Sequence, residues 1–537
     1  MDWLASPQLS LLRVLLLLGA VLLFTTWVMS PQHDIRAYGC DPFGYLRQAQ
    51  LFRDHGWIAG LNTAMTEPDA RDFVTAAKAV FGPRVHWIDI VAPHCHHFAS
   101  ATGAVINQYP PLTGFFLSLF PVETAPAALY VTMMLIVAAA FVIMTACARQ
   151  SSWLGSAVAA ASLYLIYRAE TYHGMTSSVS LPESVGFGAL AALLTLAMAR
   201  TVGMMRLAIA VALGVLIGVL VGIRIPNAFL VFGISAYLFF IPLSRKDRAM
   251  LTLAGCIGLV LGMVPLLAAN VINAGGLLAT TYGPADASLP TFGPRILWEN
   301  LGFYFWSAPS AALLIAAICI TLGRLAFPRR DENSRPDRAA AVASGVQLLI
   351  ATAFFLTHAI TTGYYIIPAS AFALCLVSFD LLTAGKLQPG STVLATRLVA
   401  VVALTLLVAF AVQRISRIEP RHFMVEAPQA MLAPEARVWS DMNSGSITYY
   451  LNKYAAKASF GDDCMRMALM QQLGREGHPQ YLVDDAHTMH KAIAEIQKNV
   501  VLEQVGTLDF YDRKSPVYLL KANAVWNEAA PKTCGLQ

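Results

Sequence analysis

The sequence predicts a polytopic α-helical membrane protein with a small α/β domain at its C-terminal end. Of its 537 residues, 57% are hydrophobic and only 13% are charged, whereas an ordinary soluble domain has about 25% charged residues. Between Leu9 and Gln413 the apolar residues form blocks of about twenty, the length at which a helix crosses a bilayer. After Gln413 the composition is that of a soluble domain. The net charge of +5 is modest and dispersed, which argues against a nucleic-acid partner.

The apolar blocks predict about eleven transmembrane helices. Charges, prolines and glycines bound them at 9–29, 124–147, 152–167, 181–199, 206–222, 227–243, 249–269, 301–323, 341–360, 363–382 and 397–413. The first block is long and has no small-residue cleavage site, so we interpret it as a retained helix rather than a signal peptide.

The basic residues of the short connectors predict the orientation. One set of connectors holds most of them: Arg149, Arg200, Arg206, Arg245, Lys246, Arg248, Arg324, Arg329, Arg330, Arg335, Arg338, Lys386 and Arg397. The opposite connectors hold little beyond Arg168, Arg224 and Arg295. Because Lys and Arg concentrate on the cytoplasmic side, we expect a cytoplasmic N-terminus. Residues 30–123 and 414–537 are then outside.

Four cysteines lie in the two outer segments, two in each. They are Cys40, Cys95, Cys464 and Cys534. An oxidising compartment permits disulfides, so we predict that Cys40 pairs with Cys95 and Cys464 with Cys534. A chance distribution is the alternative.

The first outer segment begins with a helix signal, since Asp41 is followed by Pro42. A carboxylate can cap free N–H groups, and proline fits the first helical turn. We expect a short helix to about His55, lying along the membrane surface, with Asp41, Tyr45, Gln48 and Phe52 on one face. The later run Tyr109-Pro110-Pro111 is held extended and predicts a sharp re-entry towards the membrane.

The C-terminal segment alternates strand and helix patterns, which predicts an α/β layer domain. The strands are expected at 437–440, 457–460, 480–483, 500–505 and 517–520, and the helices at 446–454, 462–473 and 486–498. It has no P-loop or dinucleotide fingerprint. We therefore expect a lid or an acceptor-docking domain without chemistry of its own.

Several motifs, taken in order, resemble the GT-C glycosyltransferases. They are Asp41-x-x-x-Tyr45-Leu46-x-x-Ala49, Tyr109-Pro110-Pro111-Leu112, Asn270 to Tyr282-Gly283 with Gly275-Gly276 between, and Tyr364-Tyr365-Ile366-Ile367-Pro368-Ala369. That class includes protein O-mannosyltransferases and lipid A aminoarabinose transferases. Two positions depart from the family pattern: Pro42 stands where a second acidic residue is common, and Gly363 where many bacterial relatives have arginine.

The resemblance implies a protein of the bacterial inner membrane. Its GT-C-like catalytic domain would span residues 1–413, including the loop 30–123, and residues 414–537 would form a periplasmic domain. It also implies an inverting transfer of a hexose or pentose from a polyprenyl-phosphate donor to a lipid, glycan or protein acceptor.

This reaction needs a carboxylate to deprotonate the acceptor hydroxyl. Asp41 stands where a lipid-linked donor would present its sugar, and we assign it as the general base, with Asp34 as the reserve. A helix cap alone would also explain Asp41.

The leaving phosphate needs cations. Arg224, between two apolar blocks, is the leading candidate; Arg168, His173 and His358 are the others. An arginine that reaches lipid headgroups is the alternative for Arg224. The candidate substrate-binding residues are Tyr45, Tyr109, Tyr282, Arg295 and Tyr364. Tyr282 and Arg295 are in a glycine-containing loop that can move over bound donor.

A tract of three histidines, His94, His96 and His97, is a candidate divalent-metal site with Glu67, Asp69 or Asp72. Its spacing matches no standard zinc site, and histidines exposed to solvent in a loop are the favoured interpretation. No other cofactor is expected.

Three function classes remain open. The first is the glycosyltransferase. A transporter or lipid flippase would also be polytopic, although no internal repeat is evident. A non-catalytic envelope-assembly protein would use the C-terminal domain as its working part.

Overall fold

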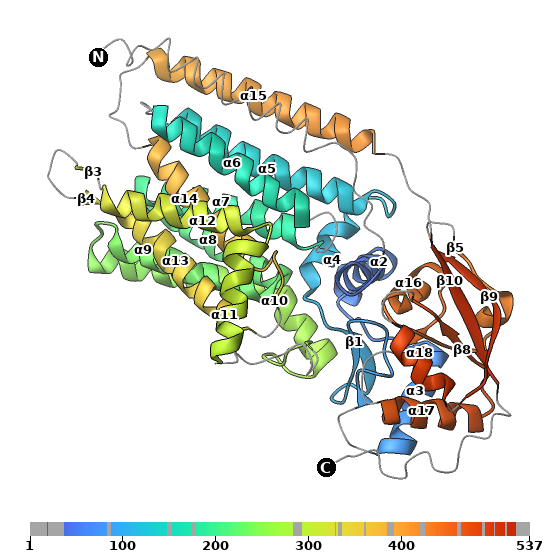
Figure 1. Cartoon of the computed structure of the whole chain (residues 1–537). Coiled ribbons are helices and arrows are strands. Elements are labelled where there is room, and N and C mark those ends of the chain that lie inside the picture. The colour runs from blue at the N-terminus through green and yellow to red at the C-terminus, as the bar shows by residue number, and fades with distance from the viewer. Residues whose placement is uncertain are drawn as a thin grey trace. The chain divides into compact units, whose positions relative to one another are not determined.

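The computed structural model describes most of the chain as two compact units (Figure 1). The described residues are 19, 37–82, 87–147, 153–173, 179–282, 293–327, 329–330, 336–358, 361–383, 391–418, 425–458, 463–485, 489–498, 500–510 and 513–521. One unit comprises 1–34, 124–266 and 288–419, and the other 35–123, 267–287 and 420–537. The first predicted span, 9–29, lies outside the described residues apart from Gly19.

The first unit is helical, and its helices fall on the other ten predicted spans. They are α5 (Ala125–Cys147), α6 (Trp153–His173), α7 (Leu181–Arg200), α8 (Gly203–Ile223), η3 (Ile225–Phe229), α9 (Leu230–Phe240), α10 (Arg245–Ala274), α11 (Pro294–Gly302), η4 (Phe303–Ser307), α12 (Ala311–Ala326), α13 (Ala339–Leu356), α14 (Ile367–Thr383) and α15 (Ser391–Ser416). Two antiparallel strands of two residues each, β3 (Arg329–Arg330) and β4 (Pro336–Asp337), follow α12.

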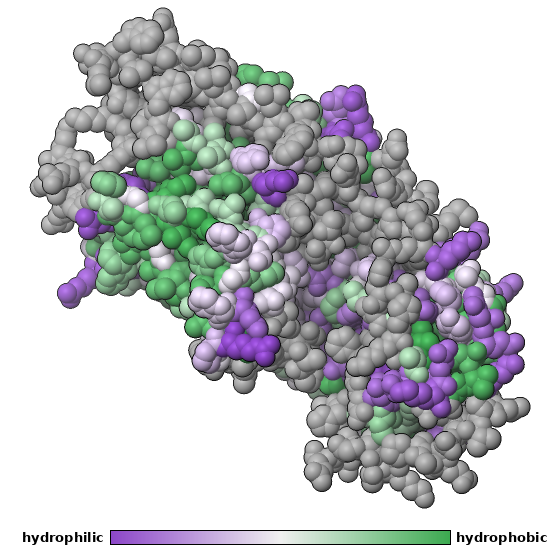
Figure 2. All heavy atoms as spheres, viewed as in Figure 1, coloured by the Kyte–Doolittle hydropathy of each residue, from purple (hydrophilic) through white to green (hydrophobic). Residues whose placement is uncertain are grey.

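Five described helices are long and apolar enough to cross a membrane: α5, α7, α8, α10 and α13. The pair α11–η4 and α12 makes a sixth if counted as one span, although it is bent by 90°. Three shorter apolar helices lie at 225–240, 367–382 and 404–416. Hydrophobic residues cover much of the helical face in Figure 2, as expected for a surface in contact with lipid. The protein is therefore a multi-pass membrane protein by the length and composition of its helices.

The backbones of α8 and α10 touch at glycines. A Cβ atom added to Gly262 would lie 2.1 Å from the Val215 carbonyl oxygen, and one added to Gly258 would lie 2.2 Å from that of Val211. Membrane helices use small residues in this way because close backbone contact supplies the packing that the hydrophobic effect does not.

Replacing Gly262 with alanine is therefore expected to lower the thermal stability of the protein. The added methyl group must displace a backbone, and overpacking costs about 1–3 kcal/mol. Gly255→Ala on the same helix is the control, because its Cβ would lie 3.9 Å from the nearest atom, the Ala210 carbonyl oxygen. If the two variant proteins have the same melting temperature in detergent, this account of the contact between α8 and α10 is contradicted.

The second unit contains the first outer segment and the C-terminal segment. The first contributes α2 (Asp41–Ala59), α3 (Pro68–Phe81), the antiparallel strands β1 (His96–Ala99) and β2 (Ala104–Asn107), and α4 (Pro111–Ser118). Helix α4 starts directly after the extended Pro110, as the paired prolines predict. Helix α2 is longer than expected, with a break at Gly56, where φ is +78°.

The C-terminal segment forms the predicted α/β layer. Its elements are β5 (Val425–Glu426), η5 (Gln429–Leu432), β6 (Arg437–Ser440), α16 (Ser444–Tyr450), β7 (Ala455–Lys457), α17 (Asp463–Arg475), β8 (Gln480–Val483), α18 (His490–Gln497), β9 (Leu502–Phe510) and β10 (Arg513–Leu520). The strand order is β5-β9-β10-β8-β6-β7. Strands β7, β6 and β8 are parallel, whereas β9 and β10 form an antiparallel hairpin longer than the two short strands predicted there.

The two segments of this unit share one hydrophobic core. Phe73 of α3 packs edge-on against Trp439 of β6 at a centroid distance of 4.9 Å, and both are fully buried. Beside them, Arg437 forms ion pairs with Asp69, at 3.0 Å, and with Asp72, and Lys453 pairs with Asp69 at 2.8 Å. The loop 30–123, which the sequence analysis groups with the membrane helices, is thus packed on the C-terminal segment.

Candidate functional site

The side chain of Asp41 accepts a hydrogen bond from the hydroxyl of Tyr109. Asp41 is the first residue of α2, and Cys40 occupies the N-cap position without a side-chain capping bond. Asp41 is therefore not the N-cap residue that the sequence predicts. The helix already includes Asp41, and the N-cap position is one residue earlier. The carboxylate instead lies beside the side chain of Tyr109, which is in the connection between β2 and α4.

Three of the predicted tyrosines lie together, and Tyr109 connects them to this carboxylate. The rings of Tyr45 and Tyr109 are 4.5 Å apart, and those of Tyr109 and Tyr282 are 6.4 Å apart. Thr281 donates a hydrogen bond of 2.9 Å to the Gln108 carbonyl, which joins the 281–282 segment to Tyr109. We call Asp41, Tyr45, Tyr109 and Tyr282 the Asp41 cluster. A carboxylate bordered by aromatic rings is suited to a ligand with both hydroxyl groups and apolar faces.

Residues that the sequence analysis did not single out build this arrangement. A Cβ atom at Gly44 would lie 2.4 Å from the Tyr109 ring, so glycine is needed for the tyrosine to lie against α2. Asn107 donates a 2.8 Å hydrogen bond to the Gly44 carbonyl and accepts one of 3.1 Å from the Tyr109 N–H. Asn107 lies two residues before the Tyr109-Pro110-Pro111 motif. This position is the sequence feature that could have identified it.

The predicted disulfide between Cys40 and Cys95 is present, with the Cα atoms 5.1 Å apart. It links the residue before Asp41 to the histidine tract. Cys464 is also disulfide-bonded, and its predicted partner Cys534 lies outside the described residues.

Two of the three histidines are not exposed loop residues, and for them that expectation was wrong; His94 lies in a turn and is half-buried. His96 and His97 are in β1 and are 1% and 6% exposed. The His96 ring lies 4.8 Å from the Phe43 ring, and its Nδ1 is 3.2 Å from the His94 carbonyl oxygen. A tract of polar residues gives no sign of a buried strand such as β1.

The proposed metal partners of the histidines are engaged elsewhere. Glu67 pairs with Arg47 at 2.9 Å, while Asp69 and Asp72 pair with Arg437. Among the described residues, the grouping with metal-ligand spacing is Cys40, His94 and Cys95, and two of its three members form the disulfide. A metal at the three histidines has no support from these contacts.

Burial sets the protonation of these rings. Burial, aided by the Lys457 ammonium group, lowers the pKa of His94 to about 4, and burial lowers the pKa of His96 to about 3. Burial also lowers the pKa of His97. All three are therefore neutral in the folded protein at pH 7.

The second unit is accordingly expected to lose stability in mild acid. In the unfolded chain these rings take up protons near pH 6.5, but in the folded chain His94 does so only near pH 4 and His96 near pH 3. Between those values the unfolded state binds more protons, so the free energy of unfolding falls as pH drops below about 6.5. Each unit of pKa difference is worth about 1.4 kcal/mol. Melting temperatures measured from pH 7.5 to 4.5 should show the decline, and His96→Gln should make it shallower; an equal slope in both proteins would refute the assignment.

Arg224 lies in a second cluster, in the helical unit. It follows α8 and is 9% exposed. Its guanidinium carbon is 4.6 Å from the ring centre of Tyr364 and 4.8 Å from that of Tyr365, which are cation–π distances. The His358 and Tyr365 rings are 6.3 Å apart. Three predicted residues, Arg224, His358 and Tyr364, are therefore brought together.

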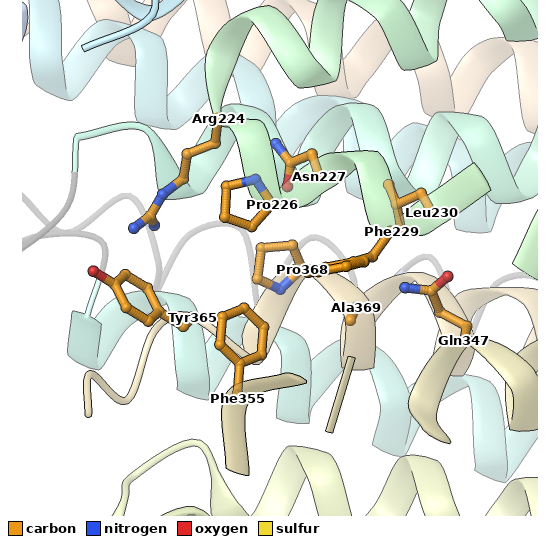
Figure 3. A pocket seen from close by; sticks show the side chains of 10 residues that line it. All are labelled: Arg224, Pro226, Asn227, Phe229, Leu230, Gln347, Phe355, Tyr365, Pro368 and Ala369. Carbon is orange, nitrogen blue, oxygen red and sulfur yellow. The ribbon is translucent and has the colours of Figure 1, made fainter. Parts of the chain in front are cut away.

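A small pocket opens beside Arg224 (Figure 3). The arginine lies at one end of its lining and Gln347 at the other, with Phe229, Phe355 and Pro368 between them. Gln347 is fully buried, and its Oε1 accepts a 3.3 Å hydrogen bond from the Gly233 N–H. A cation at the end of an apolar slot suits a ligand with an anionic head and an apolar chain.

The remaining predicted residues are not part of either cluster as described. Arg168, on α6, is exposed. Arg295, on α11, is also exposed and pairs with Glu299 at 2.8 Å. Asp34 and the side chain of His173 lie outside the described residues.

Comparison with solved structures found similar chains. No family model and no curated protein matches the chain. The crystal structure of ArnT from Cupriavidus metallidurans in the apo state is similar over 86% of this chain and 95% of that chain, with 15% sequence identity and a TM-score of 0.45. No residue role is carried over from it.

Proposed function

We propose that this protein is a membrane glycosyltransferase that moves one sugar from a polyprenyl phosphate to an acceptor hydroxyl. The Asp41 cluster is the observation that carries the proposal. Its carboxylate is fixed by Tyr109 rather than used as a helix cap. Tyr45 and Tyr109 are buried, whereas the half-buried Tyr282 offers an aromatic surface against which a sugar ring can pack. A carboxylate near an aromatic ring suits a polyol better than an ion.

In the proposed reaction Asp41 accepts the proton of the acceptor hydroxyl as that oxygen bonds to the anomeric carbon. The bond from the anomeric carbon to the phosphate oxygen breaks, and polyprenyl phosphate leaves with the electron pair. A single displacement of this kind inverts the anomeric centre. Tyr109 orients the carboxylate by its hydrogen bond.

Arg224 is proposed to bind the donor phosphate and to stabilise the charge that develops on it as it leaves. Tyr364 and Tyr365 hold the guanidinium by cation–π contacts, so the arginine is ordered before the donor binds. His358 is the second candidate for the same role, because it lies next to Tyr365.

The location that goes with this function is also a proposal. The chain would be in a bacterial inner membrane, with residues 1–413 forming the catalytic domain. Its N-terminus would be cytoplasmic, and residues 30–123 and 414–537 would lie in the periplasm, where the acceptor would be a lipid, glycan or protein. The distribution of basic residues supports this orientation.

A transporter or flippase is the second candidate, and the 90° bend between α11–η4 and α12 is the observation that favours it. Broken helices are typical of transporters. A flippase moves an intact lipid and leaves its mass unchanged, whereas a glycosyltransferase adds one sugar to the acceptor.

Mass analysis of envelope lipids and glycans separates these functions. Cells without the protein should lack a species that differs from its precursor by one sugar residue. The wild-type gene should restore this species, and the Asp41→Asn variant should not. If the Asp41→Asn gene also restores the species, Asp41 is not the general base. If glycans and lipids are unchanged in cells without the protein, the glycosyltransferase proposal is refuted.

A further inference from the structure

An apolar groove of about 270 Å³ lies between α7, α8, α9 and α10 in the helical unit. Its walls include Leu213 and Ile217 of α8, Ile234 and Leu238 of α9, and Leu259 of α10. No residue of the Asp41 cluster and none of the residues around Arg224 lines it. It is therefore separate from the pocket beside Arg224.

Small residues create this space. Gly214 and Gly255 both line the groove, and a Cβ atom at Gly255 would have no neighbour closer than 3.9 Å. Cys256 also lines it and is exposed. The groove is thus open at its side, where lipid surrounds a membrane helix.

One end of the groove is positively charged. Arg248 lines it, and its guanidinium group is held by hydrogen bonds to the carbonyl oxygens of Leu238, at 3.2 Å, and Ile241, at 3.4 Å. The exposed Arg245 and Lys246 are on the same first turn of α10. Asp247, the acidic residue of this turn, is hydrogen-bonded to Ser244 at 2.7 Å.

The start of α8 adds to this charge because α8 and α10 run parallel. Gly214 of α8 meets Gly255 of α10, and Gly218, one turn later, meets Leu259 and Gly262. Both helices therefore begin at the same end, where Arg206 of α8 joins the basic turn of α10. Helix N-termini carry partial positive charge, which favours an anion there.

We propose that this groove binds one anionic phospholipid. The acyl chain lies between α8, α9 and α10, and the phosphate lies at Arg248. A basic pocket between membrane helices is a recognised site for anionic headgroups. Phosphate alone would leave the apolar walls uncovered, and a zwitterionic lipid has no net charge to match the arginines and lysine. The proposal does not depend on the glycosyltransferase function.

Cys256 reports occupancy of the groove without any mutation. The purified protein in detergent is treated with N-ethylmaleimide, with or without added phosphatidylglycerol, and alkylation is followed by peptide mass analysis. Phosphatidylglycerol is expected to slow the labelling of Cys256 several-fold. Cys319 of α12, which is also exposed, should react at the same rate throughout. Equal protection by phosphatidylcholine of the same chain length, or none by either lipid, would overturn the proposal.

Two variants with matched controls test the two halves of the site. Gly255→Leu fills the groove, while Gly323→Leu on α12 adds the same side chain where a Cβ atom meets nothing within 4 Å. Arg248→Gln removes the charge in the groove, and Arg338→Gln removes an exposed charge before α13 that does not line the groove. Native mass spectrometry should find a retained phosphatidylglycerol on the wild-type protein and on both controls, and several-fold less on Gly255→Leu and Arg248→Gln. Equal retention by the folded Gly255→Leu protein would refute the site.

Discussion

Replacing Asp41 with asparagine is expected to lower sugar transfer by about 100-fold or more, the usual contribution of a general base. Asparagine keeps the shape of the side chain and can still accept the hydrogen bond from Tyr109. It cannot take up the proton of the acceptor hydroxyl. The protein should therefore fold, with a melting temperature near that of the wild type, while the rate of transfer falls.

Two further variants separate the possible roles of this carboxylate. Asp34→Asn removes a charge from the same outer segment and should leave transfer nearly unchanged. Tyr109→Phe removes the hydroxyl that orients Asp41, and we expect a smaller loss than for Asp41→Asn. If Asp34→Asn abolishes transfer and Asp41→Asn does not, the base is Asp34. If neither matters, the assignment of a carboxylate base fails.

Replacing Gly445 with alanine is expected to lower transfer by roughly 10- to 100-fold, although Gly445 is about 400 residues away from Asp41 in the sequence. Its Cβ atom would lie 2.4 Å from the ring of Phe43, two residues after Asp41. The ring and the start of α2 must then move, and a shift of about 1 Å in a reacting group can cost about 100-fold in rate. Steady-state kinetics should show the loss mainly in kcat.

The control for Gly445→Ala is Gly474→Ala. Gly474 is also a helical glycine of the C-terminal segment, but its Cβ atom would lie 3.4 Å from the nearest atom, Nε2 of Gln480, and activity should be kept. Trimming Phe43 to leucine in the Gly445→Ala protein should restore part of the rate, since the two side chains compete for one space. A fully active Gly445→Ala protein would show that the C-terminal segment does not position Asp41.

The C-terminal segment has contacts with the start of α2 that its sequence did not predict. Alternating strand and helix patterns predicted its α/β fold, because a local pattern determines each element. The pattern contains no information about what the sheet packs against. The structure shows that Gly39 donates a 3.0 Å hydrogen bond to the Met442 carbonyl, and that the Ser446 hydroxyl donates one of 2.7 Å to the Ala37 carbonyl. The segment that leads into Asp41 is therefore bound to the C-terminal segment.

The membrane helices could be predicted from the sequence for a similar reason. A block of apolar residues of sufficient length predicts a helix by itself, and each described block is helical. The sequence did not predict contacts between distant segments. Examples are the burial of His96 and His97 in a strand, the packing of Phe73 against Trp439, and the ion pair between Asp69 and Arg437. Each depends on a partner far away in the chain.

The candidate site also combines features that local sequence patterns predict with contacts between distant segments that they do not. Asp41, Tyr109 and Tyr282 were each singled out from local motifs, and the structure places them in one cluster. The details that hold them together were not predictable. A glycine at position 44 has no distinctive pattern, yet a side chain there would displace Tyr109. Arg224 was chosen as a charge between apolar blocks, but its two tyrosine partners come from the turn before α14, more than 100 residues later.

Transfer by the purified protein tests the central claim most directly. The protein, reconstituted in liposomes, is supplied with polyprenyl phosphates that carry a radiolabelled sugar and with an envelope extract as acceptor. The account predicts that the wild-type protein moves label to an acceptor and releases polyprenyl phosphate, and that the Asp41→Asn protein does neither. Label that stays on the polyprenyl phosphate and only crosses the bilayer, equally with both proteins, would contradict it.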